Sequence, residues 1–383
     1  MDILKYYFYY LDSQFTGFPL IIRITVFIVM LLILLYAVSM IRFFYIKRKR
    51  KKKEKLYKKM AKRFEENLKR VLFDRQNLSR NIIISKLEFE QGSLKNKEKE
   101  PVTKLLLFVK SCEDQTLNEH NYFEVIDIFE LIEYWEELLR KNNLKKNRQA
   151  LRNLEELAKS GYGNITAHKI LGRNHDLRKH SKSSYMRFAS HDAFRFLEDD
   201  FDKEFNSLDE MRIRAALEER AKQKNLPLLI RWVHTAQNES YKCFLIKEIG
   251  FFNQKESGSQ LVKMYQKEKS YPVRAQIAET LGILKYNDAI DILIDSYGIN
   301  PAMVQIRIID ALGNMDSPKS LSFLEKIYGE TQDVDLLTEI VDNIYKLDQD
   351  KGVFYKLKQK STDGFQESVF TYVEKMNEIA FVN

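Results

Sequence analysis

The sequence predicts an all-α protein in which an N-terminal transmembrane helix is followed by a helical connector and an α-solenoid of about six to seven two-helix repeats. Three observations predict this class. An apolar run without charge lies near the N-terminus, apolar positions recur at intervals of 31 and 32 residues in the C-terminal half, and strand signals are nearly absent. The 6 prolines and 13 glycines among 383 residues also suit a chain built from helices.

The apolar run predicts a transmembrane anchor over residues 20–46. Its residues 24–41 carry neither a charge nor a helix breaker, and they span roughly 27 Å as a helix, or roughly 33 Å when counted from Leu20. Arg23 lies near one end, where its long side chain can reach the interface. Tyrosine and phenylalanine residues flank both ends, as aromatic belts do. Residues 1–19 are then a short extracytoplasmic or interfacial N-terminus.

A dense basic segment, residues 42–63, follows the apolar run directly, and we call it the collar. It holds 13 Lys or Arg residues and one acid, so it carries +12 whereas the whole chain carries +9. The positive-inside rule therefore places the N-terminus outside and everything after the collar in the cytoplasm, with a single pass through the cell (inner) membrane. Residues expected to contact anionic lipid, at about 1 kcal/mol each, are Lys47, Arg48, Lys49, Arg50, Lys51, Lys52 and Lys53.

Other interpretations of the apolar run and the collar fit less well. A cleaved signal peptide has its positive residues before the apolar segment, whereas here they follow it, and a buried core helix would not carry so long an uncharged run beside the collar. Outside the collar the chain is slightly acidic, which argues against nucleic acid as the main partner. The two cysteines, Cys112 and Cys243, are far apart and suit a reduced cytoplasmic compartment.

Between the anchor and the repeats the sequence predicts further helices. Residues 47–100 comprise most of the collar and a helical connector, whose apolar residues recur at three- and four-residue steps, as in one buried helical stripe. Residues 101–146 predict membrane-proximal helices after a polar loop. The stripe of the connector contains Leu56, Met60, Phe64, Leu68, Val71 and Leu72.

The C-terminal half repeats itself in a clear register around Gly250, Gly282 and Gly313. One pair of helices cannot bury its apolar face alone, so the pairs are expected to stack into a solenoid over residues 147–361, with a C-terminal capping helix at residues 362–383. A glycine inside a first helix indicates either close approach to a neighbour or the end of that helix. The residues at matching offsets are Leu245, Ile277 and Ile308; Ile249, Leu281 and Leu312; Leu261, Leu293 and Leu324; and Tyr265, Tyr297 and Tyr328.

Counting in steps of 32 residues extends the register to three further reference points, Tyr345, Glu218 and Met186, and a looser unit covers residues 147–172. The register assigns each apolar position to the core and each charged position of the same helices to the surface. The expectations that follow most directly are that Leu281 and Leu312 are buried and that Arg274 and Lys285 are solvated.

Residues 272–297, with the sequence "PVRAQIAETLGILKYNDAIDILIDSY", and less closely residues 302–328 resemble the HEAT repeat family of armadillo-type α-solenoids. The likeness is strongest to the short bacterial form, here joined to a membrane anchor. Arg274 matches the family's arginine at the head of the first helix, whereas Lys242 and Gln305 stand at the equivalent places of the neighbouring units. The resemblance implies a HEAT-like fold across the expected solenoid and a binding scaffold, but it implies no particular activity.

No catalytic, cofactor or metal site is predicted. His168, His175, His180 and His191 lie close in sequence, but steps of seven and five residues do not place two imidazoles on one helix face as an i, i+4 step does. The acidic residues 198–204 lack the oxygen spacing and central glycine of a calcium loop. We therefore expect that the protein is not an enzyme. An unrecognised enzymatic site among these histidines is one alternative hypothesis, and a membrane-tethered nucleic-acid binder that uses the collar is another.

The leading hypothesis is a membrane-anchored cytoplasmic scaffold or adaptor that binds a partner protein through the solenoid. An accessory subunit of an envelope or exopolysaccharide system is one example, which rests on architecture alone. The resemblance implies that the second helices line the concave side, so their outward residues are candidates for partner binding. Their mixed charges suit a protein partner, although plain solvated helix faces also explain them. The candidates are Arg195, Arg231, Gln260, Lys263, Asp291, Asp295 and Lys326.

Trp232 adjoins one of these candidates. The residue lies next to a core position of its repeat, so we expect it to be a core residue at a seam between repeats. An exposed anchor for a partner is the alternative, because tryptophan is frequent among the residues that dominate binding energies.

Overall fold

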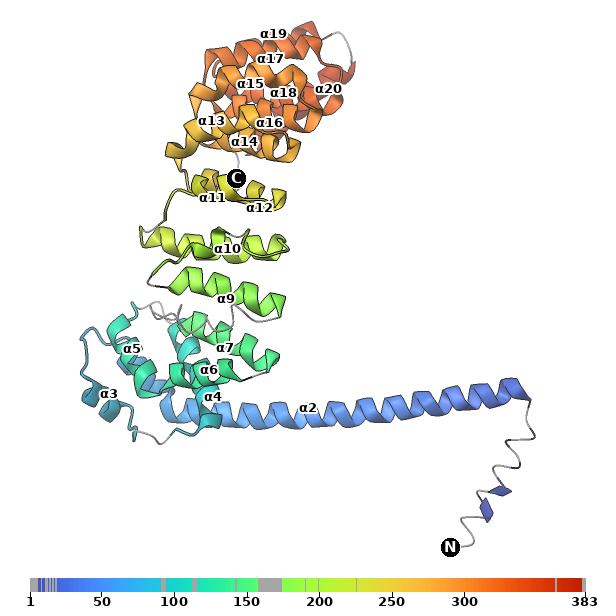
Figure 1. The fold of residues 1–383 in the computed structure, drawn as a ribbon, viewed down its shortest axis with the longest axis vertical. Coiled ribbons are helices and arrows are strands. Elements are labelled where there is room, and N and C mark those ends of the chain that lie inside the picture. The colour runs from blue at the N-terminus through green and yellow to red at the C-terminus, as the bar shows by residue number, and fades with distance from the viewer. Residues whose placement is uncertain are drawn as a thin grey trace. The chain divides into compact units, whose positions relative to one another are not determined.

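In the computed structural model every regular element is a helix, and the described residues contain no strand (Figure 1). The chain divides into two compact units, residues 1–141 with 152–157 and residues 142–151 with 158–383. The structure describes residues 6–7, 9–10, 13, 15, 17, 19–90, 94–111, 116–141, 143–157, 174–189, 191–198, 200–224, 226–361 and 364–380.

The first unit is organised by one long helix, α2 (Leu20–Leu72). It has 53 residues without an internal proline or glycine, so it extends for about 80 Å and joins the apolar run to the connector without a break. The residues of the apolar run are exposed, whereas the last turns of α2 bury Met60, Phe64, Leu68 and their neighbours. The stripe predicted for the connector is therefore confirmed.

Three further helices of the first unit pack against α2, and a fourth packs against two of these three. Phe64 of α2 meets Phe129 with ring centroids 5.4 Å apart, and Phe89 meets Phe129 at 5.1 Å, so three rings from three segments form one apolar cluster. The helices are α3 (Arg80–Lys86), α4 (Asn96–Ser111), α5 (Glu119–Ile128) and α6 (Leu131–Arg140), followed by α7 (Leu144–Leu157), whose residues are divided between the two units.

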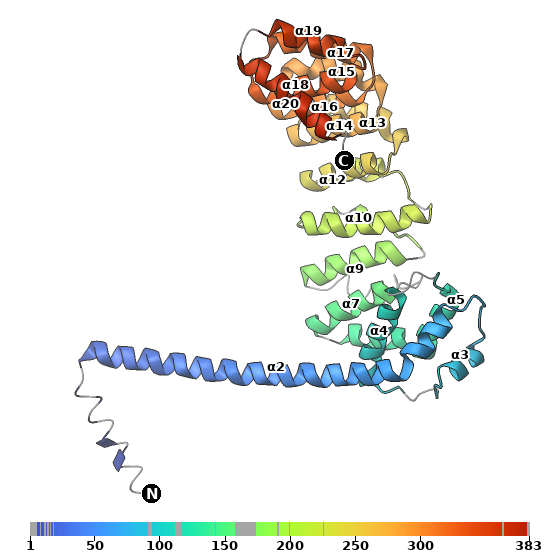
Figure 2. The same cartoon turned by 180° about the vertical axis from the view of Figure 1, so that it is seen from behind.

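The second unit is a row of helix pairs, seen from opposite sides in Figures 1 and 2. Its described residues form six pairs and one further helix, in agreement with the predicted solenoid. The looser unit expected at residues 147–172 lies partly outside the described residues. The pairs are α9 (His175–Phe188) with the short helix η1 (Arg195–Leu197), α10 (Ser207–Lys222) with α11 (Ile230–Thr235), α12 (Glu239–Phe251) with α13 (Gly258–Lys267), α14 (Tyr271–Ile283) with α15 (Ile290–Ser296), α16 (Ala302–Asn314) with α17 (Pro318–Glu330), and α18 (Val334–Leu347) with α19 (Gly352–Lys360), before α20 (Gly364–Ala380).

The repeat register places the core as expected. Leu281 and Leu312 are 1% and 0% exposed, and Lys285 is exposed in the turn after α14, so these expectations are confirmed. The expectation that Arg274 is solvated is wrong. Its guanidinium is partly buried, donating to the side-chain oxygen of Asn300 at 2.7 Å and to a backbone carbonyl at 2.5 Å. Arg274 therefore joins the loops on either side of its repeat, a role that a helical pattern does not reveal.

Successive first helices approach one another closely. A Cβ atom added at Gly282 of α14 would lie 2.5 Å from the Cα atom of Ala311 on α16, and one added at Gly313 of α16 would overlap the side chain of Asn343 on α18. Each of these glycines is also the last but one residue of its helix, so both explanations that the sequence allows, close approach and the end of a helix, are confirmed.

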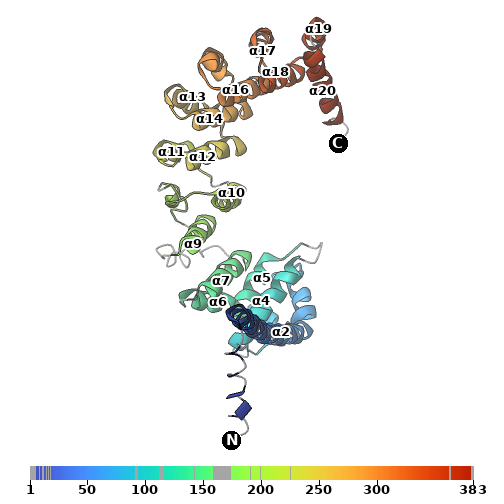
Figure 3. The same ribbon diagram turned by 90° about the vertical axis from the view of Figure 1, so that its right-hand side faces the viewer.

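The seams between second helices hold larger side chains. Tyr297, which follows α15, packs edge-on against Phe323 of α17 with centroids 5.5 Å apart, and the Tyr265 hydroxyl of α13 bonds to Ser296 of α15 at 2.7 Å. Because small residues separate the first helices and large ones separate the second, the row curves with α12, α14, α16 and α18 on its inner side (Figure 3). The expectation that the second helices line the concave side is therefore wrong.

The seam between α16 and α18 also holds two carboxyl groups in contact. The side-chain amide of Asn343 donates to Asp310 Oδ1 at 3.3 Å and to Glu339 Oε1 at 3.3 Å. A hydrogen bond to the Asp310 carboxyl, together with burial, raises the pKa of Glu339 to about 8. At neutral pH the Glu339 carboxyl therefore keeps its proton, which lets the two acidic side chains meet across a tight seam.

Candidate functional site

The seven residues proposed to bind a partner all lie on or beside second helices, on the outer side of the curve. Each of the seven is exposed. Arg231 forms an ion pair with Glu198 at 3.0 Å, and Gln260 lies 3.1 Å from the ring nitrogen of His234. They are Arg195 in η1, Arg231 in α11, Gln260 and Lys263 in α13, Asp291 and Asp295 in α15, and Lys326 in α17.

Two of these candidates, Arg195 and Arg231, meet at a hollow of about 260 Å³ between the end of α9, η1 and α11. We call it the arginine hollow. The other five candidates do not line it. Its wall consists of Ala189, Asp192, Ala193, Phe194, Arg195, Glu198, Arg220, Pro227, Arg231 and Trp232.

Aromatic rings position the two exposed arginines of the hollow. The Arg195 guanidinium lies 4.9 Å from the ring centroid of Tyr185 and 4.6 Å from that of Phe196. The Arg231 guanidinium lies 5.8 Å from the ring of Trp232. Such cation–π contacts hold a guanidinium by its flat face and leave its in-plane N–H groups free to bind elsewhere.

The third arginine, Arg220, is a residue that the sequence reasoning missed. It is 6% exposed in the last turn of α10, and its Nε donates to the Met186 carbonyl at 2.7 Å while its Nη2 donates to the Ala189 carbonyl. A signal was present in the register, because Arg220 occupies the offset at which the repeats after it carry Phe252, Leu284 and Met315. A charged residue at a core offset indicates a specific buried interaction.

Trp232 forms the apolar wall of the hollow. It is 4% exposed and packs against Phe194 with ring centroids 5.8 Å apart, which confirms the expectation of a core residue. Its indole nitrogen is buried without a hydrogen-bond partner among the described residues. The other tryptophan, Trp135, is equally buried at 1%, yet its indole nitrogen donates to Thr103 Oγ1 at 3.0 Å.

The histidines of the alternative enzymatic hypothesis do not form a described site. His168 lies outside the described residues. His175 Nδ1 lies 3.0 Å from the Arg178 guanidinium, while His180 and His191 use their backbone carbonyls to accept hydrogen bonds from neighbouring side chains. In the part of the chain that the structure describes, no group of three or more His, Cys, Asp or Glu side chains has the arrangement of a metal site.

The acidic residues 198–204, which lack the spacing of a calcium loop, are used within the fold. Asp200 accepts hydrogen bonds from the backbone amides of Gln237 and Asn238 at 2.9 and 3.0 Å. Asp202 accepts from the Arg178 guanidinium at 2.7 Å, and although burial opposes ionisation, this contact and further donors lower the pKa of Asp202 to about 2. These carboxylates therefore stabilise the start of the solenoid.

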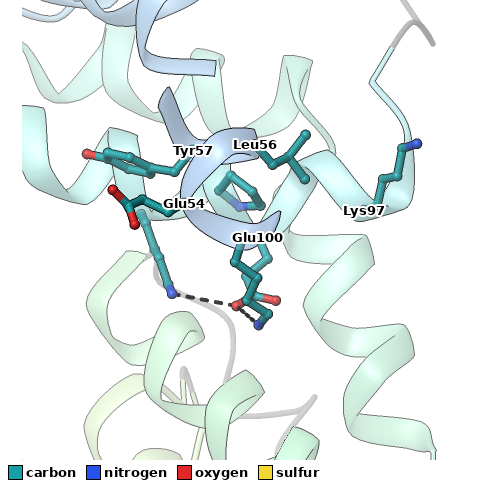
Figure 4. Close-up of a pocket in the computed structure, with 8 residues that line it drawn as sticks. Glu54, Leu56, Tyr57, Lys97 and Glu100 are labelled. Atoms are coloured by element: carbon teal, nitrogen blue, oxygen red, sulfur yellow. Dashed lines mark hydrogen bonds and ion pairs between the residues drawn. The ribbon is translucent and has the colours of Figure 1, made fainter. Parts of the chain in front are cut away.

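In the first unit a smaller groove lies where the collar meets α4 (Figure 4). Leu56, Tyr57 and Pro101 supply apolar surface, and Glu100 lies 2.8 Å from Lys53 and 3.6 Å from Lys104. Lys53, the last of the seven residues expected to contact lipid, is thus paired with Glu100 in this structure. All seven are exposed on α2.

One described helix, α2, contains a window long and apolar enough to cross a membrane, and none of that window is buried.

A comparison with protein families finds that the model described as HEAT repeats matches residues 226–302, from the segment before α11 to the first residue of α16. A comparison with curated proteins finds no match. The family match coincides with helix pairs in which the register is clear, so residues 226–302 are HEAT repeats within an all-α solenoid.

Proposed function

We propose that the protein is a non-catalytic scaffold that is anchored in the cell (inner) membrane by one helix and binds a partner protein through its solenoid in the cytoplasm. The observation that carries this proposal is the continuity of α2, because one unbroken helix joins an exposed apolar segment to a folded body in a chain with HEAT repeats. HEAT-type solenoids offer extended surfaces that suit protein partners.

The charge distribution supports the anchor and its orientation. The exposed apolar part of α2 is followed by the +12 collar, whose exposed lysines and arginines suit the anionic surface of the cytoplasmic leaflet. Lys47 also lies 5.8 Å from the ring of Phe43, a pairing of cation and aromatic ring expected at headgroup level.

The outer surface of the second unit supports a protein partner. Its exposed residues carry both signs of charge and form ion pairs between successive repeats, such as Arg231 with Glu198 and Lys319 with Asp291. Such exposed pairs each contribute about 1 kcal/mol or less, so a partner can exchange them for its own charges at small cost.

Membrane extraction tests the anchor. The full chain should remain with membranes after carbonate and high-salt washing, and a chain without residues 1–46 should be released. Release of the intact chain by salt alone would show that the collar attaches it peripherally. Proteolysis of inside-out and right-side-out vesicles should cleave the solenoid only in the former.

Affinity isolation from detergent-solubilised membranes tests partner binding. We expect reversal of charge at Arg231 together with Lys263 to weaken capture of the partner while the helix content is unchanged. The matched control is reversal of charge at Lys285, which is exposed in the turn after α14. Capture that survives the first change but is lost on deletion of residues 97–146 would place the docking site in the membrane-proximal helices.

A further inference from the structure

We infer that the arginine hollow binds a carboxylate side chain of the partner, so that the partner presents an acidic segment to the N-terminal end of the described solenoid. The inference rests on the proposed scaffold function and specifies the chemistry of its partner. It is carried by the donors that converge on the hollow from η1, α10 and α11.

The donors of the hollow are oriented before any ligand arrives. Arg220 is held by two backbone carbonyls, and Arg195 is held by the rings of Tyr185 and Phe196. Among the described residues the Arg195 guanidinium forms no hydrogen bond or ion pair, and its contacts are with aromatic rings. A planar guanidinium whose face is covered by rings presents its N–H edge, and this edge matches the two oxygens of a carboxylate.

The charge of the hollow selects the class of anion. Among the described residues that line it are three arginines and two carboxylates, those of Asp192 and Glu198, which leaves one positive charge uncompensated within this set. A single carboxylate neutralises this charge, whereas a phosphate dianion would exceed it. Arg231 is paired with Glu198, but the side chains are 72% and 51% exposed, respectively. Such an exposed ion pair is weak, so an incoming carboxylate can replace Glu198.

The buried indole nitrogen of Trp232, which has no hydrogen-bond partner among the described residues, is a second and independent observation. A buried donor without an acceptor is costly, and the chain avoids this cost at Trp135, where Thr103 accepts the indole hydrogen. At Trp232 no acceptor is present among the described residues, and the same residue lines the hollow. Entry of a carboxylate into the hollow changes the electrostatic surroundings of the Trp232 ring, which lines it.

The two tryptophans make the inference measurable in the full chain. The purified protein in detergent micelles, labelled with 5-fluorotryptophan, should give two ¹⁹F resonances, which Trp135→Phe assigns. The probe is an acetylated and amidated peptide, Glu-Glu-Phe-Glu-Glu, and its matched control has Gln at each Glu. We expect the Glu peptide to shift the Trp232 resonance saturably, with a dissociation constant of about 1 mM or below, and to leave that of Trp135 unchanged.

Substitutions then test which residues bind. Arg195→Gln and Arg231→Gln, both at exposed side chains, should each weaken binding of the Glu peptide about tenfold, whereas Lys326→Gln on the same outer surface but outside the hollow should not. The site is overturned if both tryptophan resonances move together, or if the Glu peptide and the Gln peptide act alike. The class of ligand is overturned if inorganic phosphate or anionic vesicles shift the Trp232 resonance and the Glu peptide does not.

The same variants separate this inference from the proposed function. If Arg195→Gln leaves capture of the partner from solubilised membranes intact, the arginine hollow is not the docking site, although the scaffold function stands. If the chain lacking residues 1–46 remains in the membrane fraction while the Glu peptide still shifts the Trp232 resonance, the anchor is wrong and the hollow stands.

Discussion

Replacement of Gly282 by alanine tests the physical basis of the curved solenoid. Gly282 lies in α14 at its closest approach to α16, and the new methyl group would lie 2.5 Å from the Cα atom and 2.9 Å from the Cβ atom of Ala311. Carbon atoms pack favourably at roughly 3.5–4.0 Å. The two helices must therefore separate by about 1 Å, because neither contact is with a flexible side chain.

Two opposing effects set the magnitude. Overpacking of a tight core typically costs about 1–3 kcal/mol. Removal of a glycine from a helix gains about 1 kcal/mol. Because the clash involves the backbone, we expect the upper part of the first range, and a net loss of about 1–2 kcal/mol in the free energy of unfolding.

Gly329→Ala is the matched control. Gly329 lies in α17, a second helix, and a Cβ atom added there has no neighbour within 4 Å. Urea unfolding followed by far-ultraviolet circular dichroism should show Gly329→Ala to be as stable as the parent or up to about 1 kcal/mol more stable. If Gly282→Ala unfolds at the same urea concentration as Gly329→Ala, the close approach of α14 and α16 does not require a glycine at position 282.

Two further predictions concern the core and the carboxyl pair. Leu281→Ala should cost about 2–5 kcal/mol in urea unfolding, because the side chain is 1% exposed, and a loss below about 0.5 kcal/mol would contradict the register. The Glu339 carboxyl binds its proton more tightly in the folded chain, with a pKa of about 8 against the usual 4.5, so its stabilisation is present below pH 4.5 and lost as pH rises through 8. The difference between these two pKa values corresponds to about 5 kcal/mol. Because Glu339 is partly exposed and has Asp342 and Lys346 nearby, solvent screening reduces the expected change in stability to about 1–2 kcal/mol. Glu339→Gln should flatten this pH dependence, and an unchanged slope between pH 5 and 8 would show that the pKa of Glu339 is not raised in the folded chain.

The candidate site was only partly visible in the sequence. Arg195 and Arg231 were found as outward residues of second helices, but their meeting with Arg220 required the loop after α9 to fold onto the end of α10. A register counts offsets along one helix and does not report where an irregular loop directs its carbonyl groups. The unsatisfied indole of Trp232 likewise depends on which acceptors surround it in space.

The sequence alone determined the helices and their buried faces, because the apolar period of a helix is a local property of the chain. The apolar helix near the N-terminus, the stripe that ends at Leu72 and the buried positions of Leu281 and Leu312 all followed from it, whereas the continuity of α2 was not predicted. Only the tertiary structure decided which row of helices lies inside the curve. That choice depends on the combined volume of residues from two neighbouring repeats, small at Gly282 and Ala311 and large at the aromatic seams, and no single helix contains both halves of such a contact.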